Sequence, residues 1–191
     1  MKVLITGAAG FIGSHLSRRL LADGFNIVGV DNFDKFYDPK IKRRNIESCL
    51  KNKNFRLIEA DIRDNAAMDE AVGDNIDIIA HLAARAGVRP SIDQPLLYAD
   101  VNINGTMVLL EAAKKYKIQK FIFASSSSVY GNNKKIPFSE ADNVDFPISP
   151  YAATKKACEL ICHTYHHLYK TPITCLRFFT VYGPCQRPDL A

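Results

Sequence analysis

Short apolar runs alternate with longer amphipathic stretches along most of the chain. The short runs are rich in β-branched and aromatic residues, which is typical of buried strands. They cover residues 3–6, 26–30, 55–59, 76–81, 120–124 and 173–177. The longer stretches repeat apolar residues at helical spacing and cover residues 11–22, 41–50, 66–72, 98–115 and 151–168. This alternation predicts βαβ units with right-handed crossovers, and therefore an α/β fold with a doubly wound parallel sheet.

Composition narrows the class of protein. The chain has 191 residues, of which 47% are hydrophobic and 24% charged, as expected for one soluble globular domain. No apolar run reaches the length of a membrane span, so no membrane partner is expected. The net charge of +5 comes from short Lys/Arg clusters that are typical of solvated faces, which favours a small anionic ligand over nucleic acid. Five scattered cysteines without a CxxC pair indicate free thiols and a cytoplasmic location.

The first predicted strand leads into a glycine-rich turn that is followed at once by a helix. Gly7 allows a tight turn, Gly10 lets backbone N–H groups approach a pyrophosphate, and Gly13 lets the helix pack close to the strand. The helix N-terminus supplies free N–H donors and a positive dipole end. The alternative is a glycine-rich turn without a ligand, but its position between strand and helix favours a dinucleotide site.

Acidic residues follow the second and third predicted strands. Asp31 can accept both ribose hydroxyls of an adenosine and would repel a 2′-phosphate, which favours NAD over NADP. Lys35 and the basic cluster at 40–44 are the opposing observation, since they could bind a phosphate. Asp61 could hold the adenine edge or cap the next segment, and its spacing does not separate the two roles.

Tyr151 and Lys155 lie four positions apart on a predicted helix and therefore share a face. A free tyrosine titrates near ~10, and a neighbouring ammonium favours its ionised form. The serine run 125–128 follows the fifth predicted strand, at the edge where α/β sheets bind ligands. A serine hydroxyl there could bind the substrate oxygen that the tyrosine deprotonates. A surface tyrosine beside a solvated lysine is the alternative, which the glycine turn and the serines disfavour.

These segments together resemble the extended short-chain dehydrogenases/reductases, over essentially the whole chain. The motifs that carry the resemblance are GAAGFIGSH, Asp31-Asn32, Asp61-Ile62, HLAA at 81–84, Asn102 before NGT, SSSSVYG and SPYAATK. Within that group the chain is most similar to nucleotide-sugar epimerases, and closest to the UDP-glucuronate 4-epimerases. The closer match rests on VDNFDKFYDPKIKRRNI, ARAGVRPSIDQP and RFFTVYGPCQRPDLA.

The resemblance implies a Rossmann domain with tightly held NAD and a UDP-sugar substrate that is epimerised at C4 through a 4-keto intermediate. It implies that Ser126, Tyr151 and Lys155 are catalytic. The implied cofactor residues are Gly7, Gly10, Phe11, Ile12, Gly13, Asp31, Asn32, Lys35, Asp61, Ile62, Leu82, Ala83, Ala84, Asn102, Ser125, Tyr151 and Lys155. The implied substrate residues are Arg85, Arg89, Ser126, Ser127, Thr180 and Arg187. For Arg85 and Arg89, surface ion pairing is an equal alternative.

Related activities can be compared at the same positions. A sugar 4,6-dehydratase needs an acid–base pair where Ser127 and Ser128 stand, and a UDP-glucuronate decarboxylase usually has glutamate at position 128. Both are disfavoured. A UDP-galactose 4-epimerase stays open, although Thr180 replaces its typical asparagine. A binding module that holds NAD without catalysis is the alternative from another class.

The resemblance also gives expectations about assembly and extent. Family members often dimerise through the helices at 98–115 and 151–168, so a homodimer is expected. The sequence reaches only the start of a motif that opens the sugar-binding lobe, so residues 1–191 are expected to form the NAD-binding domain without most of that lobe and to turn over little sugar. Cys158, Cys162 and His166 share a helical face, but their spacing matches no usual zinc site, so no metal is expected.

Overall fold

The computed structural model describes residues 1–187, which form a six-stranded sheet in the order β3-β2-β1-β4-β5-β6. All five neighbouring strand pairs are parallel. The strands are β1 (Lys2–Thr6), β2 (Asn26–Val30), β3 (Phe55–Ile58), β4 (Ile78–His81), β5 (Lys120–Ser126) and β6 (Ile173–Phe178). This is the strand order of a Rossmann fold, so the predicted doubly wound sheet is confirmed. The order reverses between β1 and β4, where such sheets bind their ligands.

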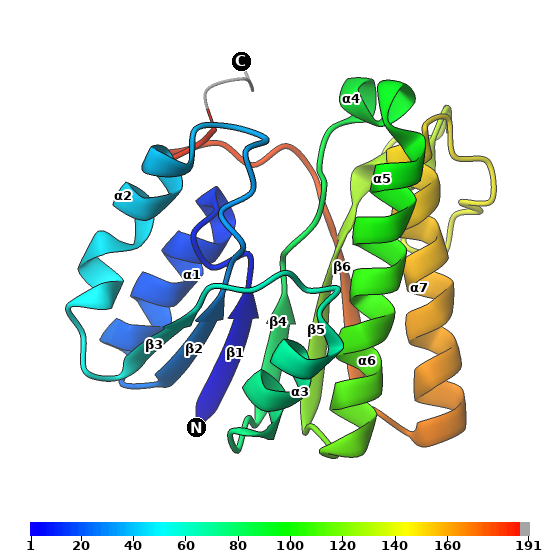
Figure 1. Cartoon of the computed structure of the whole chain (residues 1–191). Helices are drawn as coiled ribbons and strands as arrows, with labels where there is room; N and C mark the ends of the chain where they lie inside the picture. The colour runs from blue at the N-terminus through cyan, green and yellow to red at the C-terminus, as the bar shows by residue number, and fades with distance from the viewer. Residues whose placement is uncertain (188–191) are drawn as a thin grey trace.

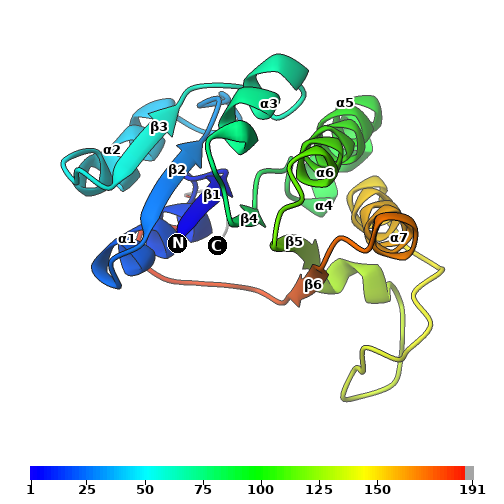
Figure 2. The same ribbon diagram turned by 90° about the horizontal axis from the view of Figure 1, so that it is seen from below.

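Helices cover both faces of the sheet (Figures 1 and 2). One face carries α1 (Phe11–Ala22) and α2 (Pro39–Leu50), and the other carries α3 (Asn65–Gly73), α6 (Gly105–Lys115) and α7 (Pro150–Tyr169). Shorter segments complete the set: α4 (Val88–Asp93), α5 (Pro95–Ala99), a π-helical turn η1 (Asp100–Asn104) and a 3₁₀ turn η2 (Ser127–Tyr130). Within residues 1–187, no helix combines the length and apolar character needed to cross a bilayer.

The predicted helix at 98–115 differs from the structure in two ways. The helical region begins earlier, at Pro95, and contains the π-helical turn η1. This turn directs the buried Asn102 amide inward, where it accepts from the backbone N–H of Arg85 at 2.8 Å and donates to its carbonyl at 3.1 Å. The amide also donates to Thr154 Oγ1 on α7. A regular 3.6-residue period cannot indicate such a turn, because tertiary hydrogen bonds stabilise it.

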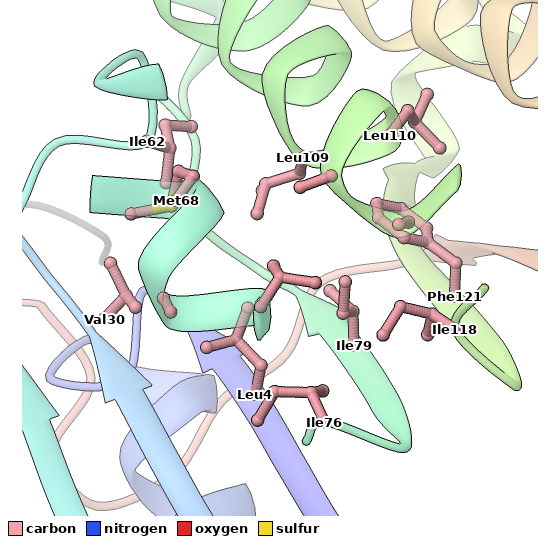
Figure 3. Close-up of a cluster of buried hydrophobic side chains, with 14 of the residues drawn as sticks. Leu4, Val30, Ile62, Met68, Ile76, Ile79, Leu109, Leu110, Ile118 and Phe121 are labelled. Carbon is pink, nitrogen blue, oxygen red and sulfur yellow. The ribbon is translucent and has the colours of Figure 1, made fainter. Parts of the chain in front are cut away.

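Two apolar cores explain why the strands are apolar on both faces. On one side, Leu4, Ile79 and Phe121 from three neighbouring strands face Met68 of α3 and Leu109 of α6 (Figure 3). On the other side, strand residues pack with residues of α1 and α2; this cluster includes Val3, Ile5, Ile27, Leu21 and Ile46. The sheet is therefore packed between two layers of helices. The loops that follow the carboxyl ends of the strands lie at one edge of it and can form a site there.

The chain after β6 returns across the molecule toward α1 (Figure 2). The carbonyl of Pro184 lies 2.8 Å from Nε2 of His15 on α1. This return brings Arg187 to the carboxyl end of the central strands, where its guanidinium lies 4.8 Å from the centre of the Phe36 ring. Segments from both ends of the described chain therefore meet at one edge of the sheet.

Candidate active site

The glycine turn after β1 has the geometry that its spacing predicts. Gly7 has φ +69°, and a Cβ there would lie 2.9 Å from the backbone nitrogen of Ala83 at the end of β4. A Cβ on Gly13 would lie only 2.1 Å from the Gly7 carbonyl oxygen, so only glycine allows this contact between α1 and the turn. Gly10 begins α1 without a side-chain cap. The first backbone N–H groups of α1 are therefore left for a ligand or water.

A cleft of about 170 Å³ lies beside this turn, over the carboxyl ends of β1, β2 and β4. Nine of the residues predicted to hold the cofactor line it: Gly7, Gly10, Asp31, Asn32, Asp61, Ile62, Leu82, Ala83 and Ala84. Two residues predicted to bind substrate, Arg85 and Arg187, also line this cleft. Four further lining residues lie on the segment after β2 and were not among the predicted cofactor residues, namely Asp34, Phe36, Tyr37 and Lys42.

Asp31 is buried at the end of β2 and connects that strand to the glycine turn. Its Oδ2 accepts from the N–H of Ala9 at 3.0 Å, and its Oδ1 accepts from the N–H of Phe33 at 2.9 Å. Each carboxylate oxygen keeps further acceptor capacity, so both can also receive ligand hydroxyls. The residue therefore combines a structural role with an acidic surface in the cleft.

Asp61 accepts hydrogen bonds from two neighbouring side chains. Arg63 donates through Nε at 2.9 Å and Nη2 at 2.8 Å, and Asn32 donates at 2.9 Å. The Arg63 hydrogen bonds lower the pKa of Asp61 to about 2, so its carboxylate stays ionised. The helix that follows is capped by Asp64, whose side chain accepts from the N–H groups of Ala66 and Ala67. Asp64 is therefore the cap of α3, while Asp61 caps the short segment before it, since Asp61 Oδ1 accepts from the backbone N–H of Arg63 at 2.9 Å.

Tyr151 and Lys155 lie on the first turns of α7, which begins with Ser149 as its cap and Pro150 as its first residue. Lys155 is buried, and its Nζ donates to the carbonyl of Ala124 on β5 at 2.8 Å. The same Nζ lies 5.9 Å from the centre of the Tyr151 ring. The predicted shared face is confirmed, and the helix places a fixed cation beside the phenol at the end of β5.

The serine run begins inside β5, because the strand extends two residues beyond the predicted end. The Ser125 hydroxyl donates to Glu159 Oε1 at 2.5 Å, so the Ser125 side chain is hydrogen-bonded to α7. Ser126 caps the short turn η2, and its Oγ accepts from the N–H of Ser128 at 3.1 Å and from the Ser128 hydroxyl at 2.9 Å. Ser126 therefore keeps its own O–H for a ligand.

Glu159 and Arg177 are site neighbours that the motif analysis missed. Arg177 on β6 donates to Glu159 from Nε at 3.0 Å and from Nη2 at 2.9 Å. Its guanidinium also lies 5.0 Å from the centre of the Tyr130 ring. A signal was present in the helix, because Glu159 lies one turn after Lys155 and shares its face.

The other predicted residues have different surroundings. Arg85 forms an ion pair with Asp34 at 3.2 Å and lies 5.0 Å from the centre of the Phe36 ring. Lys35, Arg89 and Thr180 are exposed, while Ser127, Phe11 and Ile12 are half-buried. None of these last six lines the cleft. The cleft thus brings together nine of the seventeen predicted cofactor residues, and the predicted catalytic residues Ser126, Tyr151 and Lys155 are not among the residues that line it.

No group of three or more histidine, cysteine or acidic side chains within residues 1–187 is arranged to hold a metal ion. Cys158 and Cys162 are buried in the core. The His166 ring nitrogen Nδ1 instead lies 2.9 Å from the carbonyl of Thr171. The three residues on one helical face thus have separate structural partners.

A protein-family model described as GDP-mannose 4,6 dehydratase matches residues 4–191. The chain belongs to this family. A probable UDP-glucuronate 4-epimerase from Rhizobium meliloti is 47% identical over the whole chain, and UDP-glucuronate 4-epimerase 1 from Arabidopsis thaliana is 48% identical. The chain covers 56% and 45% of these proteins, respectively.

A solved structure shows a similar relationship. UDP-glucuronic acid 4-epimerase from Bacillus cereus, solved with UDP-glucuronic acid and NAD, superposes with a TM-score of 0.94 at 46% identity. The match covers 100% of this chain and 60% of that one. The described fold is therefore the fold of that part of the epimerase, and the chain spans between 45% and 60% of the length of these relatives.

Proposed function

We propose that this chain binds NAD and supplies the catalytic serine, tyrosine and lysine of a UDP-sugar 4-epimerase. The proposed reaction converts UDP-glucuronate to UDP-galacturonate. The observation that carries the proposal is the buried Lys155 ammonium beside the Tyr151 ring, at the sheet edge that also carries the glycine turn. The 46% identity to an epimerase solved with NAD and UDP-glucuronic acid supports this choice of ligands.

The residues of the cleft fit a dinucleotide. The glycine turn and the uncapped N-terminus of α1 provide backbone donors for a pyrophosphate, and the Cβ contacts at Gly7 and Gly13 show how tightly this cradle is packed. Asp31 would accept the adenosine ribose hydroxyls and repel a 2′-phosphate, so NAD is favoured over NADP. Asp61 and Ile62 would lie against the adenine.

The proposed chemistry uses three side chains around one sugar oxygen. NAD, when bound, supplies reversible hydride transfer at C4 of the sugar. Tyr151 would remove the proton from the 4-hydroxyl and later return it. Lys155 would stabilise negative charge that develops at the reacting oxygens during the proton transfer, because its ammonium is buried 5.9 Å from the centre of the Tyr151 ring and therefore weakly screened. Ser126 would donate its free O–H to the same sugar oxygen, because its lone pairs already accept from Ser128.

The domain and substrate assignments belong to the same proposal. We infer that residues 1–191 form the cofactor-binding domain of the epimerase. Arg85, Arg89, Ser127, Thr180 and Arg187 are the proposed sugar-nucleotide contacts. The resemblance supports them, and the structure adds that Arg85 and Arg187 both lie against the Phe36 ring.

We further propose a cytoplasmic homodimer formed through α6 and α7. Exposed apolar side chains on these helices support the interface, namely Met107, Leu160 and Leu168. Leu160→Glu is expected to shift the mass measured by light scattering from dimer to monomer. An unchanged mass, or a monomeric wild-type chain, would contradict the proposed interface.

The test of the proposed function begins with native mass spectrometry of the purified chain. We expect one NAD per chain and weaker binding of NADP. Tyr151→Phe should retain NAD binding with at most a small loss of affinity, and should lower conversion of UDP-glucuronate, measured in the protein that contains the complete site, by about 10²–10⁴-fold. A wild-type chain that binds no NAD, or a Tyr151→Phe enzyme with full activity, would overturn the proposal.

A further inference from the structure

His81 is a buried titratable residue that the proposed chemistry does not use. It is the last residue of β4, and only 2% of its surface is exposed. Its Nδ1 lies 2.7 Å from Oγ1 of Thr6, the residue directly before Gly7, and its Nε2 lies 3.0 Å from Oγ1 of Thr106 on α6. A neutral imidazole has one N–H, so one ring nitrogen of His81 donates and the other accepts.

The neighbouring groups fix the direction of these two hydrogen bonds. The hydroxyl of Thr106 donates to the carbonyl of Asn102 at 2.6 Å, so Thr106 can only accept from His81. His81 therefore carries its proton on Nε2, and its Nδ1 accepts from the hydroxyl of Thr6. Thr6 in turn accepts from the N–H of Ala83 at 3.2 Å. In the opposite tautomer, Thr6 would receive two donors, and its own buried proton would have no acceptor within residues 1–187.

The same network continues to the helix that carries the proposed catalytic residues. Asn102 also donates through its side-chain amide to Oγ1 of Thr154 at 3.0 Å, and the Thr154 hydroxyl donates to the carbonyl of Tyr151 at 2.8 Å. The side chains of this network are all buried. A buried polar network in which every donor is used holds its elements in one arrangement. One connected set of hydrogen bonds thus runs from the glycine turn, through His81, to the first turn of α7.

We propose that His81 is a positioning residue that holds the glycine turn and the Tyr151 helix at a fixed separation. His81 itself does not line the cleft. NAD would be held by the glycine turn, whereas Tyr151 would act on the sugar oxygen at the carbon that exchanges hydride with NAD. A small change in the separation of the two groups lowers the rate of a reaction that needs both to be aligned. The inference rests on the proposed function.

NMR spectroscopy of the chain labelled with ¹⁵N-histidine tests the direction of the network. Two-bond couplings between the ring nitrogens and the carbon-bound ring protons distinguish the two tautomers. The chain has five histidines, so replacing the other four by glutamine, one at a time, assigns the His81 signals by elimination. At neutral pH we expect a single neutral tautomer with its proton on Nε2. A proton on Nδ1, a mixture of tautomers or an imidazolium would overturn the proposal.

Thr106→Val tests whether the network positions the reacting groups. Valine keeps the shape of threonine and removes the hydroxyl that connects His81 to Asn102. In the protein that contains the complete site, we expect kcat for conversion of UDP-glucuronate to fall by about 10- to 100-fold with little change in KM. Thr106→Ser retains the hydroxyl and should keep most of the wild-type kcat. Equal rates for the two variants would contradict a role of the hydroxyl.

The matched control separates positioning from a general loss of stability. Val72→Ala on α3 removes buried apolar groups from the core that α3 and α6 share, without touching the network. It should lower the stability of the fold and leave kcat unchanged. If Val72→Ala and Thr106→Val lower kcat equally, the effect belongs to destabilisation and the positioning role is overturned.

Failure of the proposed function and failure of this inference give different results. If wild type binds no NAD and converts no UDP-glucuronate, the proposed function fails and the positioning role fails with it, whichever tautomer the spectrum shows. If wild type is active and Thr106→Val has the wild-type kcat, only the present inference fails. Should Thr106→Val unfold, as judged by circular dichroism, Thr6→Val removes the hydroxyl on the other side of the His81 ring and should lower kcat to the same extent; an unchanged kcat there would contradict the proposal.

Discussion

Glu159 on α7 and Arg177 on β6 form a two-point ion pair whose side chains are only 11% and 16% exposed. The pair joins the helix that carries Tyr151 and Lys155 to the strand at the edge of the sheet. Its hydrogen bonds raise the pKa of Arg177, so the guanidinium remains charged throughout the accessible range. Glu159 also accepts from Ser125, which directly precedes the predicted catalytic serine.

Removal of this carboxylate should destabilise the fold. Glu159→Ala leaves the charge of Arg177 largely buried without its partner, so we expect a loss of about 3 kcal/mol in the free energy of unfolding by urea. Glu47→Ala removes an exposed partner of Lys51 and should leave the stability unchanged within error. The double variant Glu159→Leu/Arg177→Met should recover part of the loss; equal or greater destabilisation would contradict the argument.

Gly13→Ala tests the contact between α1 and the glycine turn. Alanine normally favours a helix, but its Cβ would meet the Gly7 carbonyl at 2.1 Å, and that oxygen belongs to backbone. We expect destabilisation of about 1–3 kcal/mol or more, together with weakened NAD binding. The control is Gly73→Ala on α3, where the new Cβ would meet only the movable end of the Tyr116 side chain at 3.0 Å. Equal melting temperatures for the two variants would show that the turn can relax.

His81 should make stability depend on pH. Its ring is fully buried between Thr6 and Thr106, and burial lowers the pKa of His81 to about 3, with a smaller effect from the charge of Lys155. The unfolded chain binds the proton near ~6.5 and the native state does not, so stability is complete above that pH and falls as the pH is lowered toward 3. We expect a loss of about 2 kcal/mol between pH 7.5 and 5.

The histidine variants identify the source of this pH dependence. His81→Gln should flatten the dependence of the urea midpoint on pH, whereas His163→Gln, at an exposed position of α7, should retain it. The window above pH 5 avoids most titration of carboxyl groups, whose ordinary pKa values lie near ~4. Asp61 has a pKa of about 2 in the native state and therefore also stays ionised in this window. A His81→Gln slope equal to wild type would refute the assignment.

The thiols should differ in reactivity. Cys49, Cys158 and Cys162 are buried, whereas Cys185 is exposed. Burial raises the pKa of Cys49 and Cys158, which further reduces their thiolate fraction. Iodoacetamide should label Cys185 first and reach the buried three only after unfolding, as read by peptide mass spectrometry. Cys185→Ser should remove the fast phase; rapid labelling of Cys158 in the native chain would contradict the packing of α7.

The order and kind of nearly all elements could be predicted from residue patterns. Strands that are buried on both faces give unbroken apolar runs in the sequence. The glycine turn is visible in the sequence because Gly7 and Gly13 occupy positions where a Cβ would collide with the backbone. The Tyr151 and Lys155 spacing needed only helix geometry. Each of these features is local, so neighbouring residues in the sequence contain the information.

The contacts between distant segments required the folded chain. Helical periodicity could not indicate the π-helical turn around Asn102, which depends on partners at Arg85 and Thr154. Lys42 is a second example. The sequence predicts it to be one of a solvated cluster of basic residues, whereas tertiary packing buries its side chain in the cleft that Asp31 also lines. A side chain's burial and its partner depend on which segments the sheet brings together. The sequence by itself determined the scaffold and the local motifs of this protein, and only the tertiary structure decided which charges face the cleft.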